Sequence, residues 1–154
     1  MYKSSLGAKM KILIMGLPGS GKTTLAEKLL EELHKNGHAE WLNADEVRKE
    51  FDDWDFTPDG RLRQAKRMRV LADKCVEAGF PVVCDFVCPT QELRRIFNPD
   101  ITIWMDTIAE GRFADTNKLF EEPIGDFFRI PTMDSEYWSA HIVELLLAKE
   151  QFLS

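Results

Sequence analysis

The stretch KILIMGLPGSGKTTLAEKLLEELHKNG, residues 11–37, decides the fold of this 154-residue chain. Its first five residues, Lys11–Met15, form an apolar run that is typical of a strand buried on both faces. From residue 23 to residue 36 leucines recur on one helical face, and Gly37 marks the end of the predicted helix. Residues 16–23 between them, GLPGSGKT, match the pattern G-x-x-x-x-G-K-S/T in full. Strand, loop and helix together predict a phosphate-binding loop.

This loop has the residue types that hold the phosphates of a nucleoside triphosphate. Its glycines allow successive backbone N–H groups to point at phosphate oxygens, and the following helix adds its positive N-terminal end. Lys22 is expected to reach the β- and γ-phosphates, and the Thr23 hydroxyl to hold Mg²⁺. We therefore predict ATP and Mg²⁺ as cofactors. The residues predicted to bind the nucleotide are Gly16, Pro18, Gly19, Ser20, Gly21, Lys22, Thr23 and Thr24.

The rest of the chain alternates between strand and helix patterns. Strands are expected at residues 39–42, 81–84 and 101–105, and helices at 45–51, 60–78, 91–97 and 135–152. This alternation predicts an α/β fold of three layers, in which a parallel sheet of four to five strands is flanked by helices. We expect a single domain over residues 1–154, with residues 1–9 flexible, 52–59 a loop and 107–131 a lid.

The composition limits the classes of protein to which the chain can belong. Twenty basic and 26 acidic residues give a net charge of −6, which argues against a broad basic surface that coats nucleic acid. No run approaches the roughly 18 apolar residues of a membrane span, so we expect no membrane partner. Three cysteines without a C-x-x-C pair indicate neither a disulfide nor a zinc framework, and favour a reducing, cytoplasmic location.

An acid and an arginine follow the second predicted strand, where a phosphoryl acceptor is expected to lie. Asp45 is suited to accept the proton of an acceptor hydroxyl, while Arg48 binds an anionic group. A helix N-cap formed by Asn43 or Asp45, with Arg48 on a solvated face, explains the same residues. The residues alone leave both interpretations open.

A basic run and a second strand-end acid carry two further candidate sites. Residues 60–69, GRLRQAKRMR, contain five cations and fit either a solvated helix face or a clamp for phosphate or sulfate. Asp85 follows the third predicted strand and can hold Mg²⁺, and Phe86 beside it can stack on a base. A helix-capping aspartate and a core phenylalanine are the simpler alternative for that pair.

In this order the motifs resemble the adenylylsulfate (APS) kinase family, whose members phosphorylate the ribose 3′-hydroxyl of adenylylsulfate with MgATP. The loop at 16–24 and the element LNADEVR at 42–48 carry most of the resemblance. Partial matches follow at residues 56–67, 85–89, 94, 105–107 and 115–120. The chain departs from the family pattern at Asn43, Ala44, Gln64 and Asp85, where the family has Asp, Gly, Asn and Ser, and in a shorter lid.

The resemblance implies a role for each matching residue. Lys22, Asp45 and Arg48 are implied to be catalytic, with Asp45 as the general base. Thr23, Asp45 and Asp85 make up the predicted Mg²⁺ site, and Arg112 and Lys118 in the lid are implied to cover the ATP phosphates. The residues expected to bind the acceptor are Arg48, Arg61, Lys66, Arg67, Phe86 and Arg94.

We therefore expect transfer of the γ-phosphate of ATP to a hydroxyl of a nucleotide-type acceptor, most like adenylylsulfate kinase. Residues 111–123 also resemble virus-encoded relatives, some of which phosphorylate 5-hydroxymethyluracil bases in DNA, and residues 43–48 are similar to polynucleotide 5′-kinases. A kinase acting on a nucleic-acid hydroxyl is therefore the alternative, and a non-catalytic ATP-binding module is a third. The sequence leaves the oligomeric state open, a homodimer included.

Overall fold

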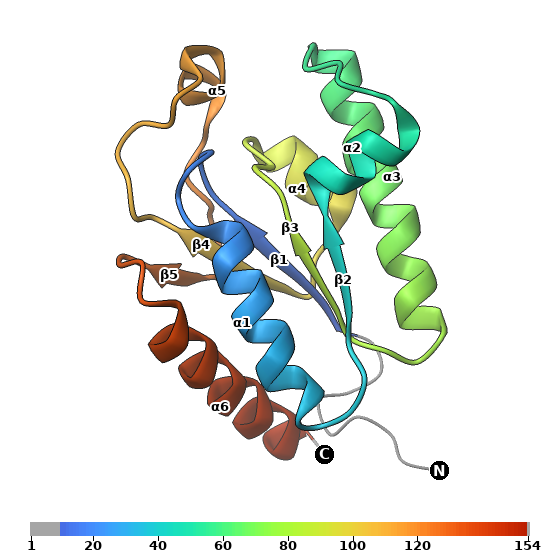
Figure 1. Cartoon of the computed structure of the whole chain (residues 1–154), viewed down its shortest axis with the longest axis vertical. Helices are drawn as coiled ribbons and strands as arrows, with labels where there is room; N and C mark the ends of the chain where they lie inside the picture. Colours follow the sequence, from blue (N-terminus) through green and yellow to red (C-terminus); the bar gives the residue numbers. More distant parts are fainter. Residues whose placement is uncertain (1–9, 154) are drawn as a thin grey trace.

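The computed structural model describes residues 10–153, and Figure 1 shows a central sheet between two layers of helices. The five strands are all parallel and run in the order β2-β3-β1-β4-β5. The strands are β1 (Lys11–Met15), β2 (Glu40–Asn43), β3 (Val82–Asp85), β4 (Ile101–Met105) and β5 (Phe128–Ile130). The helices are α1 (Lys22–His34), α2 (Ala44–Phe51), α3 (Pro58–Glu77), α4 (Gln91–Phe97), α5 (Ala114–Leu119) and α6 (Ser135–Leu153). The predicted three-layer α/β fold is confirmed, while residues 1–9 lie outside the described part.

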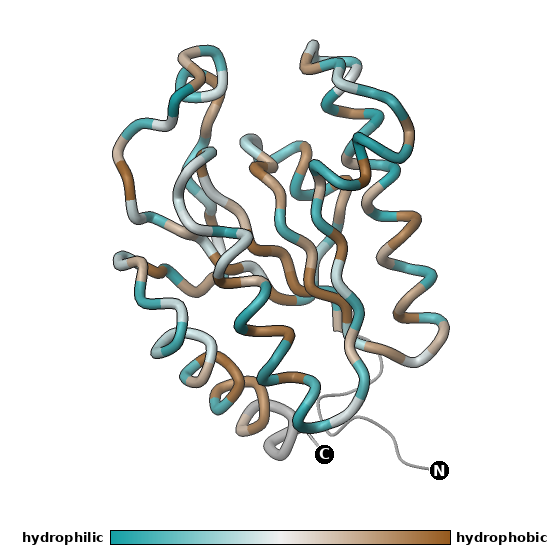
Figure 2. The backbone as a smooth tube through the Cα atoms, viewed as in Figure 1, coloured by the Kyte–Doolittle hydropathy of each residue, from teal (hydrophilic) through white to brown (hydrophobic). Residues whose placement is uncertain are grey.

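Each face of the sheet has its own hydrophobic cluster. Side chains of neighbouring residues in a strand point to opposite faces, so Ile12 and Ile14 pack towards α1 and α6. Leu13 and Met15 pack on the other side, towards α2, α3 and α4. Figure 2 shows the hydrophobic colour concentrated along the central strands. Both clusters hold β1 in place, and β1 leads directly into the phosphate-binding loop. Within residues 10–153 no helix is long and apolar enough to cross a membrane.

Most element boundaries match the predictions to within one residue. Helix α3 begins at Pro58 rather than at residue 60, because the Thr57 side chain accepts the backbone N–H of Gly60 and proline fits the first turn. The predicted loop at 52–59 is therefore two residues too long. Helix α5 and strand β5, with six and three residues, were not predicted, because elements this short depend on their neighbours.

The parallel topology gathers the candidate residues at one edge of the sheet. Asn43 and Asp85 end β2 and β3 and are direct partners in the register of these two strands. The phosphate-binding loop follows β1 beside them, and the segment that leads to α5 follows β4. In Figure 1 this edge faces α2 on one side and α5 on the other. Ligands of open parallel sheets bind at this edge.

Candidate functional site

A cavity of about 920 Å³ lies beyond the carboxyl ends of the central strands. This volume lies within the usual range for small-molecule sites. The phosphate-binding loop forms one wall, and the beginnings of α2 and α3 form the opposite wall. The turn after β3 forms the floor, and the segment around α5 closes the remaining side. One cavity thus joins the predicted ATP side to the predicted acceptor side.

The phosphate-binding loop keeps its shape through close backbone approaches. Gly21 has a φ of 99° at the start of α1, a left-handed conformation that glycine adopts readily. A Cβ atom at Gly16 would lie 2.8 Å from Ser20 Oγ and 2.9 Å from the carbonyl oxygen of Met105. The Ser20 side chain is buried, and its hydroxyl has no hydrogen-bond partner among the described residues. A tight loop with an unpaired buried hydroxyl fits a phosphate-binding cradle.

Lys22 lies at the end of the phosphate-binding loop and lines the cavity. Its Nζ donates to the carbonyl oxygen of Leu17 in the same loop, at 3.1 Å. Burial lowers the pKa of Lys22 from 10.5 to about 8, an effect that the nearby Asp85 and Asp45 carboxylates oppose and Arg112 reinforces. Lys22 therefore remains mostly protonated at pH 7 and lines the cavity as a cation.

Asp85 is bound by three side-chain donors at the floor of the cavity. Its Oδ2 accepts the Thr23 hydroxyl and the Asn43 amide, both at 2.9 Å, and its Oδ1 accepts the Trp41 indole N–H at 2.7 Å. Burial raises the pKa of Asp85, and these hydrogen bonds oppose the rise. Thr23, Asp45 and Asp85 all line the cavity and offer the oxygen ligands that Mg²⁺ prefers, so the residues fit a magnesium site.

At the start of α2, one residue caps the helix and another carries an exposed carboxylate. Asn43 is the N-cap, since its Oδ1 accepts the backbone N–H of Glu46 at 3.0 Å. Asp45 in the first turn is exposed and lines the cavity. The capping interpretation is thus confirmed for Asn43 and leaves Asp45 free to face a ligand.

Arg48 is not on a solvated face, which makes that alternative wrong. Its side chain is buried and lines the cavity, and its Nη1 donates to the carbonyl oxygens of Asp53 and Asp55 at 2.8 and 3.1 Å. The guanidinium carbon lies 4.2 Å from the centroid of the Phe56 ring. Arg48 therefore holds the loop between α2 and α3 while it contributes to the cavity wall.

The basic run of α3 divides between the cavity and an ion-pair network. Arg63 and Arg67 both donate to Asp53 at 2.8 Å, and these hydrogen bonds hold the pKa of Asp53 well below its usual range. Lys66 is exposed on the helix surface. Only Arg61 of the three predicted acceptor residues in this run lines the cavity, and Lys66 and Arg67 do not. The acidic loop before the helix, a partner that the sequence analysis did not consider, accounts for the position of Arg67.

Phe86 in the turn after β3 and Arg94 in α4 were both expected to bind the acceptor, and both are largely buried. Phe86 lines the cavity but is largely buried, with its ring packed edge-on against Phe97 at 5.3 Å between centroids. Arg94 is buried and does not line the cavity, because its Nε donates to the carbonyl oxygen of Cys88 at 2.9 Å and its Nη2 donates to that of Glu121. Arg94 therefore ties the turn to the segment after α5 and does not face the expected acceptor.

The segment around α5, within the predicted lid at 107–131, forms one side of the cavity. Arg112 lines the cavity, whereas Lys118 is exposed and does not line it. Arg61 Nη2 donates to the Thr116 hydroxyl at 3.3 Å and so connects α3 with α5 across the opening. Of the two predicted lid cations, the structure brings Arg112 alone to the site.

Three half-exposed aromatic side chains line the cavity and were not singled out from the sequence. Trp54 and Phe56 come from the loop before α3, and Phe113 comes from the start of α5. Their exposed fractions are 51%, 51% and 57%, compared with 8% for the predicted stacking residue Phe86. Their positions in polar loops could have indicated a ligand site from the sequence, since aromatic residues are usually buried.

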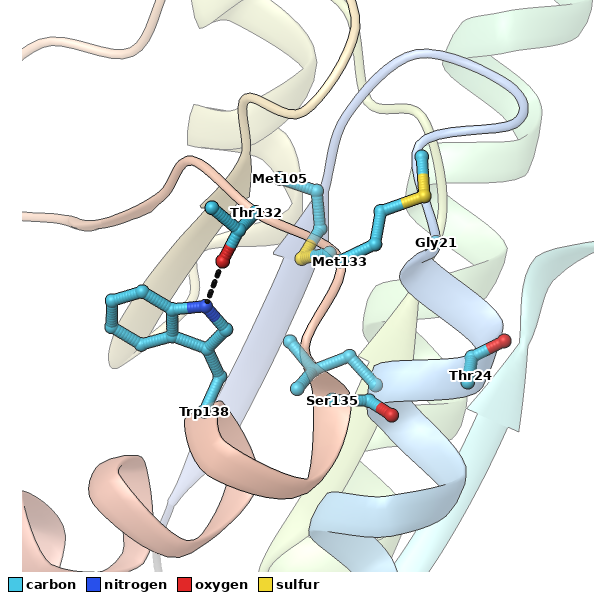
Figure 3. Close-up of a pocket in the computed structure, with 8 residues that line it drawn as sticks. Gly21, Thr24, Met105, Thr132, Met133, Ser135 and Trp138 are labelled. Carbon is cyan, nitrogen blue, oxygen red and sulfur yellow. Dashed lines mark hydrogen bonds between the residues drawn. The ribbon is translucent and has the colours of Figure 1, made fainter.

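A second cavity of about 240 Å³ adjoins the first beside α1 (Figure 3). Gly21, Thr24 and Met133 line both cavities. The Trp138 ring forms one wall, and its indole N–H donates to the Thr132 hydroxyl at 2.9 Å. The sequence analysis missed this cavity because it depends on the loop after β5, a strand that it did not predict.

Comparisons with known proteins agree with this geometry. Residues 8–123 match the family model described as adenylylsulphate kinase. The chain is 35% identical over 149 residues to the adenylyl-sulfate kinase of Citrobacter koseri, covering 90% of this chain and 74% of that protein. It is 38% identical over 87 residues to a probable adenylyl-sulfate kinase of Aeropyrum pernix, but that match spans 55% of this chain and 48% of the relative. The Mycobacterium tuberculosis APS kinase CysC, solved with AMPPNP and APS, has the same fold, with a TM-score of 0.74 at 18% identity over 90% of this chain and 97% of that one.

Proposed function

Because the chain belongs to the adenylylsulphate kinase family of ATP-dependent kinases, we propose that it phosphorylates a nucleotide-type hydroxyl, with adenylylsulfate as the first candidate. One observation carries the proposal. A single cavity has Lys22 and Thr23 on one wall and Asp45 and Arg61 on the other. Phosphoryl transfer requires two anchored substrates in line, and residues of both predicted binding sites on one cavity support the proposal.

The two adjoining cavities suggest how ATP binds. We propose that its phosphates lie on the loop around Lys22 and that its base enters the smaller cavity beside Trp138. The shared lining residues Gly21 and Thr24 make the two parts continuous. The smaller cavity offers apolar and aromatic walls, which suit a flat base. Mg²⁺, held by Thr23 and the nearby carboxylates, would neutralise charge on the phosphates.

On the acceptor side, we propose that Asp45 accepts the proton of the attacking hydroxyl. Its carboxylate is exposed to the cavity and close enough to Lys22 to influence the pKa of that residue. Arg61 and Arg48 provide positive charge on the same wall, which supports an anionic acceptor. Arg112 supplies a cation from the α5 side, where we propose that it covers the transferred phosphate.

The acceptor is identified by a parallel transfer assay. The protein is incubated with γ-labelled ATP and one of three acceptors: adenylylsulfate, DNA containing 5-hydroxymethyluracil, or an oligonucleotide with a 5′-hydroxyl. We expect label in adenylylsulfate. The half-exposed Trp54, Phe56 and Phe113 favour the DNA base as the second candidate, because exposed aromatic rings stack on bases of any sequence. Label in none of the three would contradict the proposed acceptor class.

ATP binding is expected to weaken as the pH rises above about 8. The protonated Lys22 binds phosphate, and the pKa of Lys22 in the free protein is lowered to about 8. Above that pH the protein must take up a proton to bind, so the affinity falls by up to about tenfold per pH unit. Calorimetry in buffers of different ionisation enthalpy measures both the affinity and the proton uptake. An affinity that stays constant from about pH 7 to about pH 10 would contradict this role of Lys22.

Location and assembly remain predictions from the sequence. Cys75, Cys84 and Cys88 are all free thiols, which supports the proposed cytoplasmic location.

Light scattering after size-exclusion chromatography tests the homodimer, and a monomer mass would contradict it.

A further inference from the structure

Trp41 connects the edge strand of the sheet to the centre of the site. It lies in β2, opposite Val83 of β3, and its half-buried ring packs against the cluster on the α1 face. Its indole N–H extends to Oδ1 of Asp85, two residues further along β3, at 2.7 Å. Among the described side chains this is the one donor to that oxygen, because Thr23 and Asn43 both bind Oδ2.

Different donors therefore bind the two oxygens of the Asp85 carboxylate. The side chain is 2% exposed, so water does not replace a lost donor easily. A hydroxyl has one proton, and Thr23 donates it to Asp85. Its oxygen accepts the Asn43 amide at 3.4 Å, which leaves one lone pair available to a cation. The orientation of the Thr23 hydroxyl thus depends on the orientation of the carboxylate.

We infer that Trp41 is a positioning residue for the magnesium-binding side of the site. Its hydrogen bond fixes the Asp85 carboxylate, which in turn orients the Thr23 hydroxyl towards the metal. This inference rests on the proposed function, because it assumes that Thr23 binds Mg²⁺ together with ATP. Residues that orient metal ligands typically change metal affinity by 10- to 100-fold when they are replaced.

The test is the substitution Trp41→Phe, which retains an aromatic ring and removes the N–H. Dissociation constants for ATP are measured by calorimetry with Mg²⁺ and with a chelator. In the wild type Mg²⁺ is expected to strengthen ATP binding. In Trp41→Phe this strengthening should fall by about tenfold, while the metal-free affinity stays within about twofold of the wild type.

Trp138→Phe is the matched control, because it also removes an indole N–H that donates to a side-chain oxygen. Trp138 lines the smaller cavity, away from Asp85, so this variant should change ATP affinity equally with and without Mg²⁺. An unchanged Mg²⁺ effect in Trp41→Phe would overturn the inference and leave the proposed function intact. A wild type whose ATP binding does not respond to Mg²⁺ would overturn both.

A second measurement does not depend on the stability of the variant. The chain has four tryptophans, and each gives one indole N–H signal in a proton–nitrogen correlation spectrum. The Trp41 signal should lie furthest downfield because its partner is a carboxylate, and it should shift more with Mg²⁺ and ATP than with ATP alone. A Trp41 signal that is indifferent to Mg²⁺ would contradict the inference.

Discussion

Replacing Lys22 by methionine is expected to lower turnover by at least about 100- to 1000-fold, because it removes the cation that faces the transferred phosphate. The same change should not destabilise the fold. Folding lowers the pKa of Lys22 from 10.5 to about 8, so at neutral pH the partly buried ammonium opposes folding. The methionine variant should therefore unfold at an equal or higher temperature than the wild type at pH 7.

The pH dependence separates this effect from a general change in packing. Between pH 8 and pH 10.5 the unfolded chain binds more protons at Lys22 than the folded chain does. The stability of the wild type should therefore rise towards that of the variant over this interval, by about 1.4 kcal/mol per unit of pKa shift at most. Calorimetric unfolding at several pH values measures the difference.

Lys28→Met is the matched control for Lys22→Met. Lys28 lies in the same helix, is partly exposed and pairs only loosely with Glu31, at 3.7 Å. Neither turnover nor the pH dependence of stability should change in this variant, because exposed ion pairs contribute little. If Lys22→Met retained turnover within about tenfold of the wild type, the proposed placement of the phosphates would be wrong.

The phosphate-binding half of the site could be predicted from the sequence because its information is local. The residues that decide it lie within eight positions: Gly16, Gly21, Lys22 and Thr23. The backbone of this one loop determines which residue type is needed at each position. The buried strand before the loop and the helix after it are equally local patterns. This explains why β1 was predicted to the residue and α1 to within one or two residues.

The acceptor half depends on partners that are distant in the sequence. Arg67 and Arg61 belong to the same basic run, yet Asp53 binds the first and the cavity receives the second. The sequence predicts that Arg94 binds a ligand. In the structure it donates instead to the carbonyl oxygen of Glu121, which lies 27 residues away in the segment after α5. The residue type and its spacing along a helix do not show which distant partner each arginine binds.

Replacing Asp45 by asparagine is expected to lower turnover by about 100- to 10,000-fold, the range associated with the loss of a general base. The affinity for metal-free ATP should remain within a few fold of the wild type, since the phosphate-binding loop is unchanged. The fold should also be preserved, because Asn43 rather than Asp45 caps α2. Single-turnover kinetics and ATP titrations measure the two effects separately.

Glu46→Gln provides the control, since Glu46 is an exposed acid in the same helical turn that does not line the cavity. It should retain normal turnover, which excludes a general effect of charge at the helix start. Asp45 also belongs to the proposed magnesium site, and its two roles make different predictions. If excess Mg²⁺ restores the turnover of Asp45→Asn, the carboxylate acts mainly through the metal, whereas a loss that persists at saturating Mg²⁺ identifies it as the base. Near-normal turnover of Asp45→Asn at the Mg²⁺ concentration used for the wild type would exclude both roles. Asp85, a carboxylate on the same cavity that accepts three hydrogen bonds, would then be the next candidate.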